Sequence, residues 1–375
     1  MTISMLVTRP TEDFTESFTY VFSALRGVQA GREYFVAMCP LKLIPKVFLF
    51  DEGELPPELR AQRVLNKSRV PEIARYLVEN PHDYVFSSIT ACIDGEVRFD
   101  PLETVSAHSS IGKLVVPMTA KFIINDGQHR RAAIEEALTA RPELGDETIS
   151  VVLFADGGLR RTQQMFADLN KHAIRPTKSL GILYDYRDPL AQLSRKLINT
   201  VPTFRGLTET EKTTISNRST KLFTLSSIYQ GTGALLKRCK SDPISPEQEA
   251  LAVTFWTEVS KYIPEWRLAQ QRKVAPAELR SDYIHAHGLA LHALGIAGAA
   301  LIANDPARWR QRLRAIEKVN WLRSNAKLWE GRAMVGGRVS KAHNNVILTA
   351  AVLKRALAMP LSLEEKRVEE NFGKR

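Results

Sequence analysis

The strongest chemical signal in the sequence is a short polar run that joins a carboxylate, a glycine, an amide, an imidazole and two guanidinium groups: Asp126, Gly127, Gln128, His129, Arg130 and Arg131. Glycine lets the backbone take positive φ or approach a ligand closely. The N–H groups at the start of a helix attract anions. Histidine and arginine side chains add donors that suit phosphate oxygens. The run therefore predicts a phosphate-binding turn.

Two readings of this run remain open. Asp126 could hold a divalent metal, orient His129, or cap the following helix. In the purely structural reading, Asp126 is the helix cap, Gly127 makes the turn, and the basic side chains lie at a solvated helix start.

A second polar segment, FADLNKHAIRPTKSL, covers residues 166–180 and supplies three more candidate groups: Asn170, Lys171 and Arg175. It follows the next expected strand and helix along the chain. Taken alone, it is equally well explained as a helix C-terminus whose basic residues complement the helix dipole.

Two basic loops in the second half of the chain are further candidates for DNA contact. The hydroxyl-rich stretch 211–221 contains Arg218 and Lys221. It could grip a DNA backbone, although a capped loop is the favoured reading. The glycine-rich stretch 329–341 carries Arg332, Arg338 and Lys341, and contact with phosphate is favoured there over a mere connection.

The sequence DGQHR followed by RAA, together with the segment around Asn170, resembles the DGQHR-domain proteins, which include the DndB family of DNA sulfur-modification systems. The turn is also similar to the phosphate-binding turns of ParB proteins and sulfiredoxin. The resemblance implies that Asn170 and Lys171 meet the same phosphate as the first motif. It does not extend to sulfiredoxin's redox activity, because no cysteine stands near Asp126 in the sequence, nor to a ParB clamp, because no helix-turn-helix is recognisable.

The resemblance also implies a function, namely a transcriptional repressor that binds the promoter of a phosphorothioate-modification gene cluster. The implied partners are double-stranded DNA, other DNA sulfur-modification proteins and a second copy of the chain. The rival reading is an NTPase or nuclease in which Asp126 and His129 act with a bound nucleotide and a divalent metal. The sequence assigns no cofactor firmly, and a binding role is preferred.

Elements alternate in the first half of the chain and become helical in the second. Short apolar runs in 18–50 predict a hairpin and a following strand, and strands are expected at 84–92, 121–125 and 149–154. Helical patterns occupy 56–80, 127–140 and 159–171, and later 178–199, 219–238, 246–262, 281–303, 306–318 and 340–358. We expect an α/β domain of the ParB/sulfiredoxin-like DGQHR type over residues 1–180, followed by a mostly α-helical domain over 181–375.

Composition adds limits on partners and compartment. A net charge of +11 favours a polyanionic partner without proving one. The three cysteines, Cys39, Cys92 and Cys239, have no disulfide or zinc spacing, so a reducing cytoplasm is expected. The N-terminus lacks the pattern of a secretion signal. The segment 283–304 has no charged side chain but contains three histidines, which predicts a buried helix rather than a membrane span.

Overall fold

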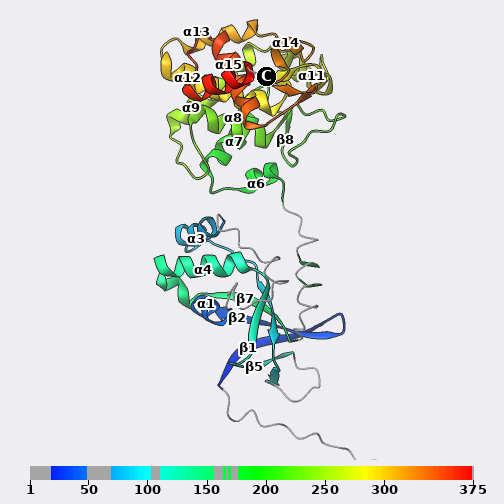
Figure 1. Cartoon of the computed structure of the whole chain (residues 1–375), viewed down its shortest axis with the longest axis vertical. Helices are drawn as coiled ribbons and strands as arrows, with labels where there is room; N and C mark the ends of the chain where they lie inside the picture. The colour runs from blue at the N-terminus through cyan, green and yellow to red at the C-terminus, as the bar shows by residue number, and fades with distance from the viewer. Residues whose placement is uncertain are drawn as a thin grey trace, which may run out of the picture. The chain divides into compact units, whose positions relative to one another are not determined.

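The computed structural model describes residues 18–48, 69–102, 110–155, 164–165, 168–169 and 176–373. Contacts divide the chain into two compact units, residues 1–174 and residues 175–375. The first combines a mixed sheet with helices, and the second is mostly helical (Figure 1). Each unit is described by itself.

A seven-stranded sheet forms the framework of the first unit, with the strand order β4-β5-β1-β2-β7-β3-β6. Neighbouring strands are antiparallel except β3 and β7, which are parallel. The strands are β1 (Thr19–Gln29), β2 (Arg32–Pro40), β3 (Ile89–Asp94), β4 (Arg98–Pro101), β5 (Ile111–Pro117), β6 (Lys121–Asp126) and β7 (Thr148–Phe154).

The hairpin expected near the N-terminus is present. β1 and β2 pair in register from Ala24 opposite Ala37 to Gln29 opposite Arg32. The turn between them is Ala30-Gly31, and both residues have positive φ, as a two-residue hairpin turn requires.

The prediction of a strand after the hairpin is wrong for the described residues, which end at 48. The chain forms the 3₁₀ turn η1 (Leu41–Leu43) and then the short helix α1 (Ile44–Val47). Pro45 lies in the first turn of α1, where its fixed φ suits a helix and its missing N–H costs nothing. Residues 49 and 50 lie outside the described residues.

Two helices pack against the sheet and against each other: α3 (Val70–Glu79) and α4 (Gln128–Ala140). Figure 1 shows them side by side, with α1 close to α4. The apolar spacing explains the contact, because Ala74 and Leu77 of α3 and Ile134 and Ala137 of α4 are buried in one core with the sheet residues. A 3₁₀ turn, η2 (Pro142–Asp146), then leads into β7.

Other elements of the first unit differ in extent from the expectation. The strand expected over 84–92 begins only at Ile89, and the strands β4 and β5 were not expected. Of the helix expected over 56–80, α3 covers 70–79, and residues 51–68 lie outside the described part. Most of the helix expected over 159–171 also lies outside it, although 164–165 and 168–169 are helical.

The second unit contains helices at each of the six expected positions. Its helical elements are α6 (Lys178–Tyr184), α7 (Pro189–Thr200), α8 (Leu225–Leu236), α9 (Pro246–Lys261), α10 (Pro264–Gln270), α11 (Pro276–Asp282), η3 (Ile284–Ala286), α12 (Gly288–Asn304), α13 (Trp309–Leu313), η4 (Arg314–Lys318), α14 (Ala326–Trp329), α15 (His343–Ala356) and α16 (Leu363–Gly373). Two short ladders complete it: β8 (Thr208–Glu209) with β9 (Phe223–Thr224), and β10 (Met334–Val335) with β11 (Arg338–Val339).

Helix α12 is the centre of this unit and confirms the expectation of a buried helix in the charge-free segment. It packs against both α8 and α15. The approach to α8 is close, because a Cβ on Gly295 would lie 2.1 Å from the carbonyl oxygen of Gly231. None of the helices in the described ranges has the length and apolar character that a bilayer crossing requires.

Candidate functional site

The polar run at 126–131 forms the strand–turn–helix that its sequence predicts. Asp126 ends β6, and Gly127 is the N-cap of the 13-residue helix α4. Gly127 has φ +110° and ψ 10°, a conformation that favours glycine. No side chain caps α4, so the alternative in which Asp126 is the helix cap is wrong. The first N–H groups of α4 therefore keep the anion-attracting character of an uncapped helix start.

Asp126 instead forms an ion pair with Arg130, one helical turn further along. Nη2 of Arg130 donates to Oδ2 of Asp126 at 2.7 Å and to the carbonyl oxygen of Ser88 at 3.0 Å. Its Nε is buried and has no partner among the described residues. Gly127 permits this arrangement, because a Cβ there would lie 3.2 Å from Nη2 of Arg130. The Arg130 guanidinium thus fixes the turn to the segment that precedes β3.

Arg131 is committed to the fold in the same way. Its Nε donates to the carbonyl oxygen of Phe48, and its Nη2 donates to that of Pro45, both at 3.0 Å. Its Nη1 donates to Glu135, and the side chain is only 12% exposed. These contacts hold the η1–α1 segment against α4.

His129 and Gln128 are the other side chains at the start of α4, and both are half-buried. Burial is the main cause that lowers the pKa of His129, and the nearby cations Arg69 and Arg130 lower it further, while Asp126 opposes them. At neutral pH the imidazole is therefore mostly uncharged and can offer a hydrogen bond rather than a full charge.

A cysteine does lie near the turn, which corrects the inference drawn from the sequence. β3 pairs with β6 so that Thr90 stands opposite Asp126, and Cys92 is two residues further along β3. The thiol is fully buried and accepts a hydrogen bond from Nδ2 of Asn125 at 2.9 Å. Oδ1 of Asn125 is buried and has no partner in the described part of the chain. The sequence could not show this, because the pairing of β3 with β6 brings together residues 33 positions apart.

The second motif cannot be placed beside the first, because Asn170, Lys171 and Arg175 lie outside the described residues. Their expected role at the same phosphate stays a prediction.

The basic candidates of the second unit fall into two groups. Lys221 and Arg332 have partners within the chain: Nζ of Lys221 donates to the carbonyl oxygen of Gly206 at 2.9 Å, and Arg332 pairs with Glu369 and lies 4.4 Å over the ring of Phe372.

The second group is open to solvent, namely Arg218, Arg338 and Lys341. None of these three forms an ion pair in the ranges that the structure describes.

The glycine turn expected to contact phosphate already holds an anion of its own. The β10–β11 turn is Gly336-Gly337, and both residues have positive φ. Their N–H groups donate to the carboxylate of Glu330, at 2.5 Å from Gly336 and 3.2 Å from Gly337. A ligand phosphate would have to displace Glu330 to use these donors.

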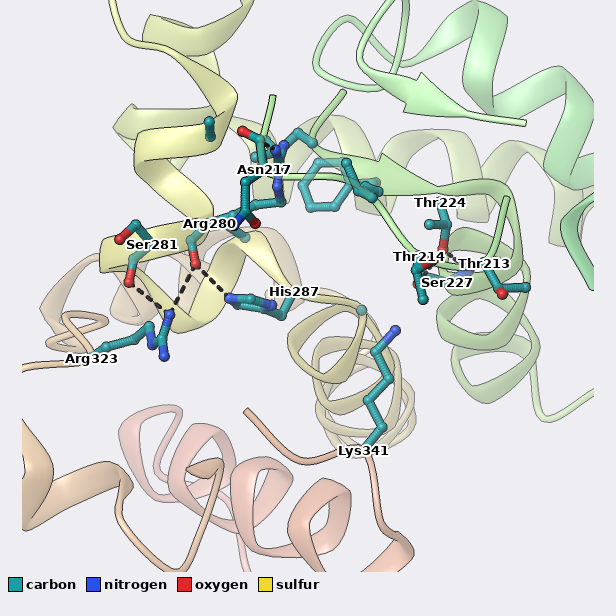
Figure 2. Close-up of a pocket in the computed structure, with 16 residues that line it drawn as sticks. Thr213, Thr214, Asn217, Thr224, Ser227, Arg280, Ser281, His287, Arg323 and Lys341 are labelled. Carbon is teal, nitrogen blue, oxygen red and sulfur yellow. Dashed lines mark hydrogen bonds between the residues drawn. The ribbon is translucent and has the colours of Figure 1, made fainter. Parts of the chain in front are cut away.

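Sequence reasoning missed a cavity in the second unit, which encloses about 560 Å³ and is shown in Figure 2. Its lining includes Arg280, His287, Arg323 and Lys341. Only Lys341 was predicted as a contact. The others lie on separate elements, and no local pattern of the sequence marks them as neighbours.

Two of the three histidines in the charge-free segment form hydrogen bonds within the fold. Nδ1 of His285 accepts a hydrogen bond from Nε1 of Trp266 at 3.1 Å, and Nε2 of His287 lies 2.9 Å from the carbonyl oxygen of Arg280. In the described part of the chain, no three His, Cys, Asp or Glu side chains gather into a metal-binding cluster.

Comparison with known proteins identifies a family. The family model DndB, described as DNA-sulfur modification-associated, matches residues 22–360 and so covers both units. No curated protein and no solved structure matches the chain.

Proposed function

The chain belongs to the DndB family of DNA-sulfur modification-associated proteins, and from this premise we propose that it is a DNA-binding transcriptional repressor of a phosphorothioate-modification gene cluster. Membership connects the chain to DNA sulfur modification. The excess of cations, +11 in net charge, supports a polyanionic partner.

The observation that carries the proposal is the uncapped start of α4 directly after β6. The helix dipole and the free N–H groups there attract a phosphate. A ParB/sulfiredoxin-like fold for this unit is part of the proposal, and it comes from the resemblance of the DGQHR sequence. Gln128 and His129 are the side chains proposed to contact the phosphate, together with Asn170 and Lys171. Arg130 is proposed to shape the turn.

The second unit is proposed to add backbone contacts through its solvent-exposed cations. Arg218 and Arg338 are exposed and form no ion pair in the ranges that the structure describes, so their charge is available to DNA phosphates. Arg175 is proposed for the same role.

The test is a comparison of two duplexes, the promoter fragment of the modification genes and a random sequence of equal length, across a salt series. We expect the promoter to bind at least about 10³-fold more tightly, as is common for specific recognition. Affinity should fall steeply with salt, and loss of one phosphate contact should make the slope shallower by about one. Arg338→Ala and Arg218→Ala should each do so.

The control is Lys318→Ala, which removes an exposed lysine at the end of η4 that forms no ion pair in the described part of the chain. Its slope should equal that of the unmodified protein. Equal and weak binding of both duplexes would refute the repressor proposal.

The alternative function is hydrolysis of a nucleotide or of DNA at the same turn, and it needs a separate experiment. Incubation with ATP, CTP, GTP or plasmid and a divalent metal tests it directly. Turnover that is lost in His129→Ala, a change that leaves the Asp126–Arg130 ion pair in place, would favour an NTPase or nuclease over a repressor.

A further inference from the structure

The cavity of the second unit brings together parts of the chain that are distant in sequence. It is bounded by the loop containing Thr213 and Thr214, the ends of β9 and α11, the start of α12, and the segments that carry Arg323 and Lys341. Its volume of about 560 Å³ is in the range of small-molecule sites. It lies far along the chain from the turn at 126–131 and within the other unit.

The cavity carries positive charge that the fold does not neutralise. Arg280, Arg323 and Lys341 line it, and its lining contains no Asp or Glu. None of the three cations forms an ion pair with a carboxylate in the described ranges.

The two arginines are held in place by neutral acceptors. Arg280 donates to the backbone carbonyl groups of Lys221, Ser216 and Ser219. Arg323 donates to those of Ser281, at 2.8 Å, and Gly337, also at 2.8 Å. These bonds fix both guanidinium groups without cancelling their charge, so the cavity is preorganised for an anion.

Lys341 differs from the arginines because its ammonium group has no hydrogen-bond acceptor in the part of the chain that the structure describes. The side chain reaches solvent, but the protein around it partly desolvates the ammonium group and so lowers its pKa. A lysine in this position gains a strong partner when an anion enters.

The start of α12 faces the same space, since both His287 and Gly288 line the cavity. α12 has 17 residues and no side-chain cap, so its N–H groups and dipole favour negative charge. Nε2 of His287 donates to the carbonyl oxygen of Arg280 (Figure 2). Burial, with the neighbouring cations, holds the pKa of His287 at about 4, so the ring is neutral at pH 7.

Because Gly288 has no side chain, two polar groups can pack closely against the start of α12. A Cβ at this position would lie 2.1 Å from Oγ of Ser227 and 2.9 Å from Nζ of Lys341. The hydroxyl and the ammonium group therefore approach one point beside the helix start. A side chain at 288 would overlap Ser227 and push it away from the helix start.

We propose that this cavity binds the phosphate group of a small phosphorylated molecule. Lys341, Ser227 and the start of α12 hold the phosphate oxygens, while Arg280 and Arg323 supply fixed positive charge. A phosphomonoester carries nearly two negative charges at neutral pH, whereas each phosphodiester of DNA carries one. Uncompensated charge in a concave site therefore favours the monoester. Thr213 and Thr214 lie where they can hydrogen-bond the rest of the ligand.

Calorimetric titration of the full chain at pH 7.5 tests the proposal with four probes: inorganic phosphate, AMP, ATP and a random DNA duplex. At least one of the three small phosphates should bind. Lys341→Gln should weaken that binding about 10- to 100-fold, the usual effect of losing one charge-assisted hydrogen bond. Because Lys341 forms no hydrogen bond or ion pair within the described ranges, its replacement should leave the fold intact.

Two variants serve as controls. Lys341→Arg keeps the charge and should retain most of the affinity, and Lys318→Gln removes an exposed charge elsewhere and should retain all of it. A further variant, Gly288→Ala, should no longer bind the small phosphates. Circular dichroism then confirms that this variant is folded.

Three results would overturn the proposal: no small phosphate binds at 10 mM (about 100-fold above a typical metabolite-binding Kd), Lys341→Gln binds them as well as the unmodified protein does, or Lys341→Gln impairs only the duplex. The last result would assign the cavity to DNA. None of them bears on promoter recognition by the turn of the first unit.

Discussion

Gly127 offers the sharpest test of how the phosphate turn is built. In Gly127→Ala the new residue would have to keep φ at +110°, outside the left-handed well near +57° that L-residues occasionally occupy. Its Cβ would also lie 3.0 Å from Cγ1 of Ile89 and 3.3 Å from the Ile89 Cα, at the start of the buried strand β3, which is held between β7 and β6. Strained backbone costs about 1–3 kcal/mol, so with the added contacts we expect a loss of about 3 kcal/mol.

The distribution of tryptophan makes this loss measurable for one unit alone. All five tryptophans belong to the second unit: Trp256, Trp266, Trp309, Trp321 and Trp329. Fluorescence therefore reports the second unit, and far-ultraviolet circular dichroism reports both. For a unit of this size, about 3 kcal/mol corresponds to a fall in Tm of roughly 6–12 °C. The fall should appear in the dichroism transition of the first unit and not in the fluorescence transition.

Substitutions at two other glycines separate the cost of backbone strain from the cost of the Cβ contacts. Gly31 has φ +73° but no atom within 4 Å of its Cβ position, so Gly31→Ala should cost only about 1–2 kcal/mol. Gly181 lies in α6 with the same open space and no positive φ, so Gly181→Ala should stabilise by about 0.5–1 kcal/mol. The reasoning is refuted if Gly127→Ala unfolds at the same temperature as the unmodified protein. A cost no larger than that of Gly31→Ala would show that the contacts with Ile89 contribute nothing.

Three further predictions concern buried charge and protonation. The pKa of His287 is about 4 in the folded chain and near 6.5 when unfolded, so the stability that the neutral ring contributes is fully present above pH 6.5 and is lost as the pH falls. In unfolding followed by fluorescence, the free energy of unfolding should be about 2 kcal/mol lower at pH 5, and His287→Asn should show a smaller decrease. Lys354→Met should cost about 3–5 kcal/mol in urea unfolding because it leaves Glu365 buried and unpaired, and adding Glu365→Gln should recover part of this; no recovery would contradict the charge argument. Arg131→Lys should lower the Tm measured by circular dichroism, because the contacts of Arg131 with two carbonyl groups need a guanidinium, and the DNA affinity of the folded protein should stay unchanged. An unchanged Tm with weaker DNA binding would instead make Arg131 a ligand contact.

Local patterns were sufficient to predict the turn at 126–131 and the helices at six positions of the second unit, but not α10, α11 and α14. The apolar run at 121–125 and the helical spacing that buries Ile134 and Ala137 both describe residues close in sequence. Proline and a capping box at Ser245 likewise mark the start of α9. The strands β4 and β5 were not predicted, because their short sequences carry no clear strand pattern. They are strands because β5 pairs with β1 and β4 pairs with β5.

At the candidate site, local sequence patterns could not predict the hydrogen-bond partners. The sequence identifies Arg130 and Arg131 as phosphate donors by type, but the acceptors that occupy them lie 42 residues away at Ser88 and 83 away at Phe48. The cavity of the second unit illustrates the same limit. Its cations come from separate elements, and only the folded chain shows that no carboxylate accompanies them in the lining.

Net charge alone cannot locate a phosphate site, because a cation paired with a carboxylate and a cation without such a partner count equally in the net charge. The structure separates them. Arg131 and Arg332 are paired with the carboxylates of Glu135 and Glu369, so their replacement should act mainly on stability. Arg338 and Lys341 have no ion-pair partner within the described ranges and keep their charge for a ligand, so their replacement should act mainly on binding. A phosphate site in this chain is therefore to be sought where fixed donors meet unneutralised charge, a condition that the cavity beside Gly288 meets more fully than the arginines of the turn.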